Sequence, residues 1–279
     1  MRLPVDVPAA PSRRAMLTAL GFTAMAGAAL RYGLVSVARA AQKAVWPSEA
    51  FAQKTEPDLI KVYFDGQAPE LSDKVMLDAP EIAENGAVVP VKVTSTLPNV
   101  TSISFMVPDN PFTLTAAYRI PAGTEASVGC RLKMAKTTKV IAVVEAGGKL
   151  YSAERTVKVT LGGCGCTGAA TEKGGCPMST IRVRANASGD SVTVQCLIQH
   201  PMDSGFVKDA AGAIVPPHYI ETVEFTADDK PVFTAFWGPA VSKDPYLSFA
   251  YNGGKKGDTL TIAWTDNKGQ SDSTTAHVL

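Results

Sequence analysis

Residues 156–168 read TVKVTLGGCGCTG, and this stretch separates two strand-rich regions of the chain. Its first part, Thr156–Thr160, alternates branched apolar with polar residues, which is typical of a β-strand with one buried face. The alternation then stops, and cysteines stand among glycines. Because glycine has no side chain to pack and adopts many backbone states, we expect a flexible, exposed arm after the strand. Taken alone, the segment also fits a plain glycine-rich linker whose cysteines are incidental or bonded to each other.

Alternating runs on both sides of this segment predict short strands separated by turn residues, and no long amphipathic helix is found. The pattern is typical of an all-β protein with two antiparallel β-sandwich domains. We place these domains at residues 41–163 and 179–279, with a Gly/Cys-rich arm and linker at 164–178. A short helix is expected from Ser48, ended or interrupted by Pro57. The predicted strands are 102–107, 112–120, 126–134, 139–145, 149–161, 181–187, 191–198, 218–226, 231–237, 246–252, 259–265 and 273–278, with a further strand after Asn85-Gly86.

Residues 1–40 have the features of a twin-arginine export signal. Arg13 and Arg14 precede a weakly apolar run over residues 17–30, and Ala38–Ala40 offers a small-residue cleavage site. A retained membrane anchor is the alternative, but the run is short and interrupted by glycines. We therefore expect export to the periplasm without a stable membrane anchor.

Charge and cysteine content narrow the possible functions. The chain has 279 residues and a formal net charge of +1, so its overall charge does not predict binding to nucleic acid. An odd number of cysteines, 5, leaves at least one unpaired within the chain. Cys130 and Cys196 lie in strand-like runs, and we expect both to be small buried side chains rather than partners in a mutual disulfide.

Both regions resemble subunits of SoxYZ, the sulfur carrier of bacterial thiosulfate oxidation. The first region is similar to SoxY in PEIAENG at 80–86, in KMAKTT at 133–138, and in the strand that enters GGCG at 162–165. The second is similar to SoxZ in HPMDSG at 200–205, in WGPAVS at 237–242 and in WTDNKG at 264–269. In that family the two subunits are separate chains that form a heterodimer of immunoglobulin-like sandwiches. The resemblance therefore implies a fused chain whose two domains pair with each other.

The resemblance also implies a function. The family's carrier cysteine corresponds to Cys164, which would hold sulfur intermediates covalently on an arm that includes Gly162, Gly163 and Gly165. The implied partners are periplasmic enzymes: a c-type cytochrome complex that attaches thiosulfate, a hydrolase that releases sulfate, and a sulfur dehydrogenase. The chain itself would be a non-catalytic carrier, and no cofactor is implied. Two features depart from the family, because Cys166 replaces the last glycine of the motif and the motif is internal.

Three arrangements of Cys166 remain open. It would form a bridge to Cys176, form a strained bridge to Cys164, or remain a free thiol that resolves adducts on Cys164. Cys176 follows two glycines, as Cys164 does, and is a second candidate for the carrier.

Other functions are also compatible with the residues. A carrier that serves a quinoprotein dehydrogenase is one, and a periplasmic interaction module with bonded cysteines is another. A third is a copper(I) site, for which the arm cysteines, Met178, Met202 and His200 are soft ligands, although we expect no bound metal. No nucleophile elbow, phosphate loop or paired-carboxylate motif predicts catalysis within the chain.

Overall fold

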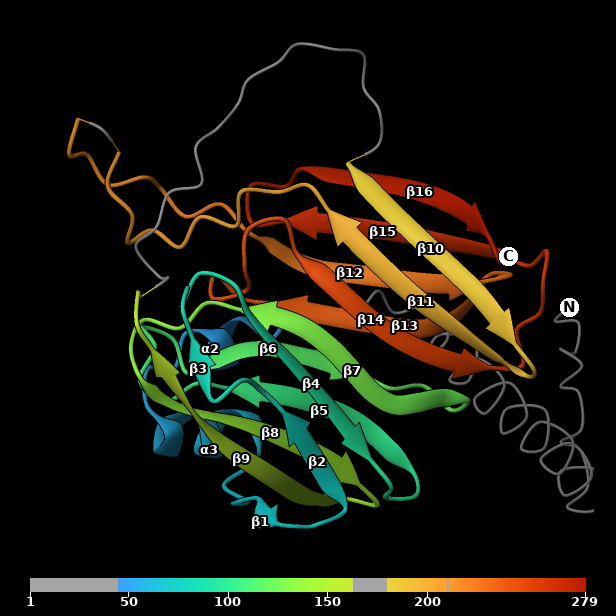
Figure 1. Cartoon of the computed structure of the whole chain (residues 1–279), viewed down its shortest axis with the longest axis horizontal. Helices are drawn as coiled ribbons and strands as arrows, with labels where there is room; N and C mark the ends of the chain where they lie inside the picture. The colour runs from blue at the N-terminus through green and yellow to red at the C-terminus, as the bar shows by residue number, and fades with distance from the viewer. Residues whose placement is uncertain (1–44, 163–179, 210) are drawn as a thin grey trace, which may run out of the picture. The chain divides into compact units, whose positions relative to one another are not determined.

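The computed structural model describes residues 45–162, 180–209 and 211–279 of the chain. Two short helices, α2 (Ser48–Phe51) and α3 (Glu56–Tyr63), precede the strands (Figure 1). Thr55 caps α3, since its hydroxyl oxygen accepts a hydrogen bond from the backbone N–H of Asp58 at 3.3 Å. The expectation that Pro57 ends or interrupts a helix was wrong. Pro57 lies in the first turn of α3, where its missing N–H removes no hydrogen bond from the helix.

Each strand that the alternating runs predict is present, with ends that differ by a residue or two. The all-β class is confirmed. Before residue 163 the strands are β1 (Glu70–Leu71), β2 (Val75–Asp78), β3 (Ile82–Ala83), β4 (Val89–Ser95), β5 (Val100–Met106), β6 (Leu114–Arg119), β7 (Thr124–Leu132), β8 (Thr138–Ala146) and β9 (Lys149–Val159). After residue 179 they are β10 (Ile181–Ser188), β11 (Ser191–Ile198), β12 (Ile220–Ala227), β13 (Lys230–Trp237), β14 (Tyr246–Asn252), β15 (Thr259–Asp266) and β16 (Ser271–His277).

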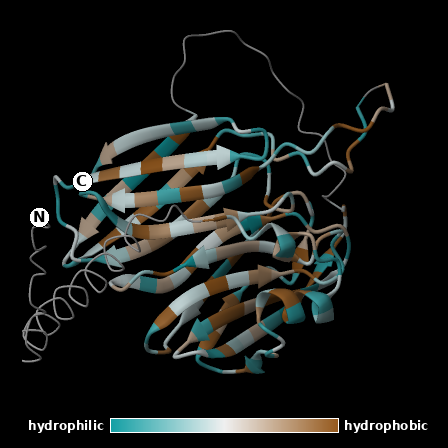
Figure 2. Cartoon of the chain, turned by 180° about the vertical axis from the view of Figure 1, so that it is seen from behind, coloured by the Kyte–Doolittle hydropathy of each residue, from teal (hydrophilic) through white to brown (hydrophobic). Residues whose placement is uncertain are grey.

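The strands form two open sheets. A 10-stranded sheet has the order β1-β9-β8-β5-β6-β13-β12-β15-β16, with β3 paired to β9. A 6-stranded sheet has the order β10-β11-β14-β7-β4-β2. In β15, buried and partly exposed residues alternate strictly, as expected for a strand with one face in the core. Figure 2 shows the same alternation of hydrophobic and hydrophilic residues along several strands.

Both sheets continue from the first region of the chain into the second. In the larger sheet β6 pairs antiparallel with β13, so that Ala116 lies opposite Trp237. In the smaller sheet β7 pairs antiparallel with β14, so that Cys130 lies opposite Leu247. The backbone groups at these strand edges are therefore paired across the two regions, which a linker-joined pair of separate sandwiches would not require.

One continuous apolar core fills the space between the sheets. Phe233 of the larger sheet stacks on Phe249 of the smaller one, with ring centroids 4.1 Å apart. Tyr118 from the first region packs on Phe233 from the second at 5.6 Å. The apolar core thus runs through both regions, and its burial holds them together. Among the described residues, no helix is long and apolar enough to cross a membrane.

Candidate functional site

Two of the cysteines are buried in the sheets and are unreactive near neutral pH. Cys130 in β7 and Cys196 in β11 are both free, and each is 2% exposed. Burial raises the pKa of each thiol to about 12, so neither forms the reactive thiolate near neutral pH. Leu247 lies opposite both of them and separates them across the sheet. The expectation of buried side chains without a mutual disulfide is confirmed.

The predicted carrier residue and its neighbours lie outside the described residues. These are Cys164, Gly163, Gly165, Cys166 and Cys176. The structure does describe the two points that bound this segment, Gly162 after β9 and Thr180 before β10. The contacts of these two residues show which parts of the fold hold the two ends of the segment.

Two glycines allow the backbone to pack tightly where the segment begins. The N–H of Gly86 donates to the carbonyl of Leu161 at 2.7 Å, and the carbonyl of Gly86 accepts from the N–H of Met134 at 2.7 Å. A Cβ atom on Gly86 would clash with the carbonyl oxygen of Met134, and one on Gly162 would clash with that of Ala135. Neither position has room for a side chain. Gly162, which we expected to belong to the flexible arm, is instead packed against Ala135.

Asn110 holds the loop against which Gly162 packs. This side chain is 5% exposed. Its amide nitrogen donates to the carbonyl of Lys133 at 2.7 Å, and its amide oxygen accepts from the N–H of Ala135 at 3.0 Å. Since both groups of the amide are used, the loop from Lys133 to Ala135 has a defined position. We call Gly86, Asn110, Lys133, Ala135 and Gly162 the arm root.

Lys133 connects the arm root to the second region of the chain. Its side chain is buried, with 6% of the residue exposed, and its Nζ donates to the carbonyl of Pro239 at 3.0 Å and to that of Met202. Its backbone N–H donates to the carbonyl of Ala240 at 2.7 Å. A buried ammonium group is costly unless it is hydrogen-bonded, and these backbone carbonyls supply that bonding. Lys133 therefore fastens the arm root to the loops around Met202 and Pro239.

The other end of the segment is also held by hydrogen bonds. The hydroxyl group of Thr180 bonds to the carboxylate of Asp272 at 2.9 Å, and the N–H of Thr180 donates to the same oxygen at 3.0 Å. The indole N–H of Trp264 donates to the Thr180 hydroxyl at 3.3 Å. The carbonyl of Thr180 accepts from the N–H of Gln199 at 2.8 Å. Both boundaries of residues 163–179 are thus fixed to the sheets.

Two histidines and an aspartate form a buried cluster next to these boundaries. Asp266 Oδ2 lies 2.7 Å from Nε2 of His218 and 3.5 Å from Nε2 of His200. Its other oxygen accepts the backbone N–H groups of Lys268 at 2.9 Å and Gln270 at 2.7 Å. Burial alone would raise the pKa of Asp266, but these hydrogen bonds outweigh burial, and the pKa lies below its usual value.

The hydrogen bonds of His200 determine which ring nitrogen carries the proton. The N–H of Met202 donates to Nδ1 of His200 at 3.2 Å, so Nδ1 is the acceptor and the proton is on Nε2. Nε2–H then points to Asp266 and has no lone pair for a metal ion. The ligand atoms of His200, His218 and Asp266 are close enough for a metal site. Their hydrogen bonds instead make the cluster a structural clasp at the base of the loop between His200 and His218.

The copper alternative relies partly on Met202, which is fully buried at 0% exposure. Its sulfur lies 3.3 Å from the backbone N–H of Ile220 and accepts that hydrogen bond. The sulfur is therefore occupied within the core. Met178 and the arm cysteines lie outside the described residues.

The clasp predicts a loss of stability in mild acid. Burial, together with electrostatic repulsion from His218, lowers the pKa of His200 to about 4 from 6.5, although Asp266 and Asp203 act in the opposite direction. Between these two values the unfolded chain binds the proton and the folded chain does not. Stability is then lost as pH falls below 6.5, by about 2 kcal/mol at pH 5. Urea unfolding at pH 7.5 and pH 5 measures this difference.

His200→Asn keeps an acceptor for the Met202 N–H and removes the titrating ring, so the difference between the two pH values should shrink by that amount. His277→Asn changes an exposed histidine at the end of β16 and serves as the control. An unchanged pH dependence in the His200 variant would contradict this account.

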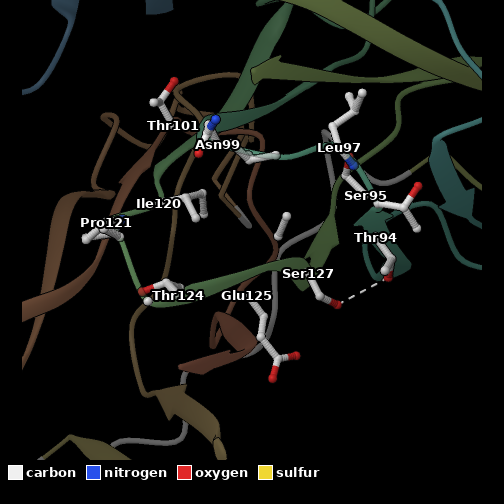
Figure 3. Close-up of a pocket in the computed structure, with 15 residues that line it drawn as sticks. Thr94, Ser95, Leu97, Asn99, Thr101, Ile120, Pro121, Thr124, Glu125 and Ser127 are labelled. Atoms are coloured by element: carbon white, nitrogen blue, oxygen red, sulfur yellow. Dashed lines mark hydrogen bonds between the residues drawn. The ribbon is translucent and has the colours of Figure 1, made fainter. Parts of the chain in front are cut away.

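One hollow lies at the opposite end of β7 from the arm root. It has a volume of about 610 Å³ and is lined by the loops that join β4 to β5 and β6 to β7 (Figure 3). It borders Thr124 at the start of β7, whereas the arm root follows the end of that strand at Leu132. A strand of this length separates the two by about 25–30 Å. The carboxylate that lines the hollow belongs to Glu125, and it accepts a hydrogen bond from Ser191 at 2.7 Å. The hollow therefore offers no free charged group for the chemistry expected of the arm.

Comparison with known proteins identifies the two regions. The family profile "Sulfur oxidation protein SoxY" matches residues 60–164, and the profile "Sulphur oxidation protein SoxZ" matches residues 181–277. The sulfur carrier protein SoxY from Chlorobium limicola f thiosulfatophilum is 40% identical over 41% of this chain and 100% of its own, with a TM-score of 0.36. The chain belongs to the SoxYZ family of sulfur-oxidation carriers. It carries a SoxY region and a SoxZ region in one polypeptide.

Another solved structure is similar at a much lower level. A β-glycosidase from Bacteroides vulgatus is 11% identical, covers 74% of this chain and 25% of its own, and has a TM-score of 0.23. A search of curated proteins found no match.

Sequence reasoning missed two residues that the structure places next to the site. Lys133 and Asp266 were part of the SoxY-like and SoxZ-like motifs, but nothing in their spacing indicated that both are buried. Asp266 also contacts His200 and His218, which are distant from it in sequence. The signal that could have found them is a charged residue flanked by strand residues, since such a residue requires a partner when it is buried.

Proposed function

We propose that this chain is a periplasmic carrier that holds sulfur intermediates covalently on Cys164 and presents them to partner enzymes. The observation that carries the proposal is the SoxY match, which ends at Cys164. Cys130 and Cys196 are buried with raised thiol pKa values, which removes them as candidates. Cys164 follows Gly162 by two residues, so its distance from the rigid arm root is at most about 7 Å.

The carrier reaction requires a thiol and an external oxidant. The Cys164 thiol and thiosulfate form a sulfur–sulfur bond, giving the protein S-thiosulfonate, and one proton and two electrons leave. A c-type cytochrome partner accepts the electrons. A hydrolase partner then adds water across the bond to the sulfonate group, releasing sulfate and leaving a persulfide on Cys164. No catalytic group of this chain takes part in either step, which is consistent with a carrier rather than an enzyme.

The SoxZ region has two roles in this proposal. It pairs with the SoxY region within the chain, which is supported by the two shared sheets and by the Lys133 hydrogen bonds. It also anchors the far end of the cysteine segment at Thr180. Because the segment is fixed at both ends, it would enter a partner as a loop, and a partner with a wider cleft is required than for a free chain end. Fusion also keeps the two regions at high effective concentration for each other.

Mass spectrometry of the protein from cells that oxidise thiosulfate tests the proposal. We expect mass additions that are removed by a reducing agent on the peptide that contains Cys164, and their complete absence in Cys164→Ser. Cys166→Ser and Cys176→Ser are the matched controls and should keep the adduct on Cys164. Adducts on Cys176 that survive in Cys164→Ser would show that the carrier has been assigned to the wrong cysteine.

A further inference from the structure

The outer face of the smaller sheet gathers basic side chains from both regions. Strand register places Lys92 of β4 next to Gly129 of β7, which is followed across the sheet by Ser248, Gln195 and Arg184. A neighbouring row runs from Pro90 through Arg131 to Tyr246, Leu197 and Arg182. We call Lys92, Arg131, Arg182 and Arg184 the basic face (Figure 1, strands β10, β11, β14, β7 and β4).

These cations have no acidic partner within the part of the chain that the structure describes. None of the four takes part in an ion pair there. Asp78 of β2 lies directly opposite Lys92 in the register of β2 and β4, but no ion pair joins the two side chains in the described residues. On the larger sheet, by contrast, Lys139 pairs with Glu154 at 3.0 Å. The net charge of the whole chain is only +1, so the basic face is a local excess of positive charge.

The centre of this face is hollowed. A depression of about 510 Å³ is lined by Lys92, Gly129, Arg131, Tyr246 and Ser248, among others. A Cβ atom on Gly129 would lie 2.5 Å from the hydroxyl oxygen of Ser248, so the floor of the depression has no room for a side chain. The guanidinium group of Arg131 lies over the ring of Tyr246 at 4.9 Å, which holds the charge at the rim. The depression therefore presents two cations, Lys92 and Arg131, and one carboxylate, Asp78, around an open space.

The basic face also borders both fixed ends of the cysteine segment. Arg131 precedes Lys133 of the arm root by two residues, and Arg182 follows Thr180 by two residues. A protein that received the segment would contact this end of the sheet. Two of the cations come from the SoxY region and two from the SoxZ region, so the face is complete only when the two regions share the sheet.

We infer that the basic face is the docking surface for an acidic patch on the enzyme that receives the cysteine segment. The carboxylates of that patch would pair with Lys92, Arg182 and Arg184, and an acidic side chain would enter the depression at Arg131. Opposite charges of this kind accelerate association and set orientation before the segment enters. The identity of the partner as the receiving enzyme rests on the proposed function, while the charge complementarity does not.

Binding of the full-length exported chain to labelled poly-L-glutamate at low ionic strength tests the surface. The variant carries Lys92→Glu, Arg182→Glu and Arg184→Glu, all on exposed positions of β4 and β10. Its matched control carries Lys230→Glu, Lys255→Glu and Lys256→Glu, which are exposed and lie at the start of β13 and in the loop after β14. We expect about a tenfold loss of affinity in the variant, about threefold or less in the control, and a loss of the difference at roughly 0.5 M salt.

Equal losses in the variant and the control would overturn the inference, since the binding would then follow net charge alone. Tighter binding to anionic phosphatidylglycerol vesicles than to poly-L-glutamate would also overturn it, because the partner would be a membrane surface. Cys164→Ser should bind poly-L-glutamate as the unaltered chain does. If the sulfur adduct is found on a cysteine other than Cys164 while binding to poly-L-glutamate is retained, the carrier residue is refuted and the docking surface stands.

Discussion

Asp266→Asn is expected to lower the free energy of unfolding by about 3 kcal/mol, because it removes the acceptor at the centre of a buried cluster. The carboxylate accepts from two histidine rings and two backbone N–H groups. An asparagine keeps one oxygen for the backbone groups. Its amide N–H₂ group would then face the N–H groups of His200 and His218, which leaves donors without acceptors in the core.

The measurement is equilibrium urea unfolding at pH 7.5, and Asp229→Asn is the control because it changes an exposed turn residue. Asp229 has a positive φ of 63°, which asparagine tolerates. A loss in Asp266→Asn no larger than that in the control would show that the cluster does not stabilise the fold. Because Trp264 lies two residues away and bonds to Thr180, amide exchange around Thr180 should also accelerate in Asp266→Asn.

Lys133→Met is expected to lower the free energy of unfolding by about 2–3 kcal/mol. Methionine has a similar length and fills the same space, but it leaves the carbonyls of Met202 and Pro239 without their donor. Relief from burying the ammonium group offsets part of this loss. Since these carbonyls belong to the SoxZ region, the effect should be concentrated at the contact between the two regions.

Lys136→Met is the control for this prediction. Lys136 lies in the same loop but is exposed, with 63% of its side chain accessible, and it pairs with Asp109 at 3.0 Å. An exposed ion pair of this kind contributes about 1 kcal/mol or less. Urea unfolding should therefore show a larger loss of unfolding free energy in Lys133→Met than in Lys136→Met. Equal losses would mean that the Lys133 hydrogen bonds to the SoxZ region do not matter for stability.

The strands were predictable because their signal is local. β11 and β14 were predicted with the ends that the structure has, since an apolar residue recurs at every second position along each of them. β2 was missed, because four residues carry too little pattern to separate a strand from a loop. Pro57 was misassigned, because a proline reads as a helix breaker unless the start of the helix is known.

The site was predictable only in part. Cys164 was assigned from the family motif, and the structure describes its surroundings only up to Gly162. The close packing of Gly86 and Gly162 depends on backbone segments that meet only in the folded chain. Which lysine is buried, and which aspartate lies between two histidines, depends on the same long-range contacts.

The sequence by itself determined the all-β class, the positions of most strands and the family, because side-chain alternation and motifs are properties of neighbouring residues. Only the tertiary structure decided that β6 pairs with β13 and β7 with β14, so that two sheets serve both regions. It also decided that Lys133 crosses to the SoxZ region, and that four cations without an ion pair in the described residues share one face. These features join residues far apart in sequence, and their energies come from burial and hydrogen bonds that exist only after the regions meet.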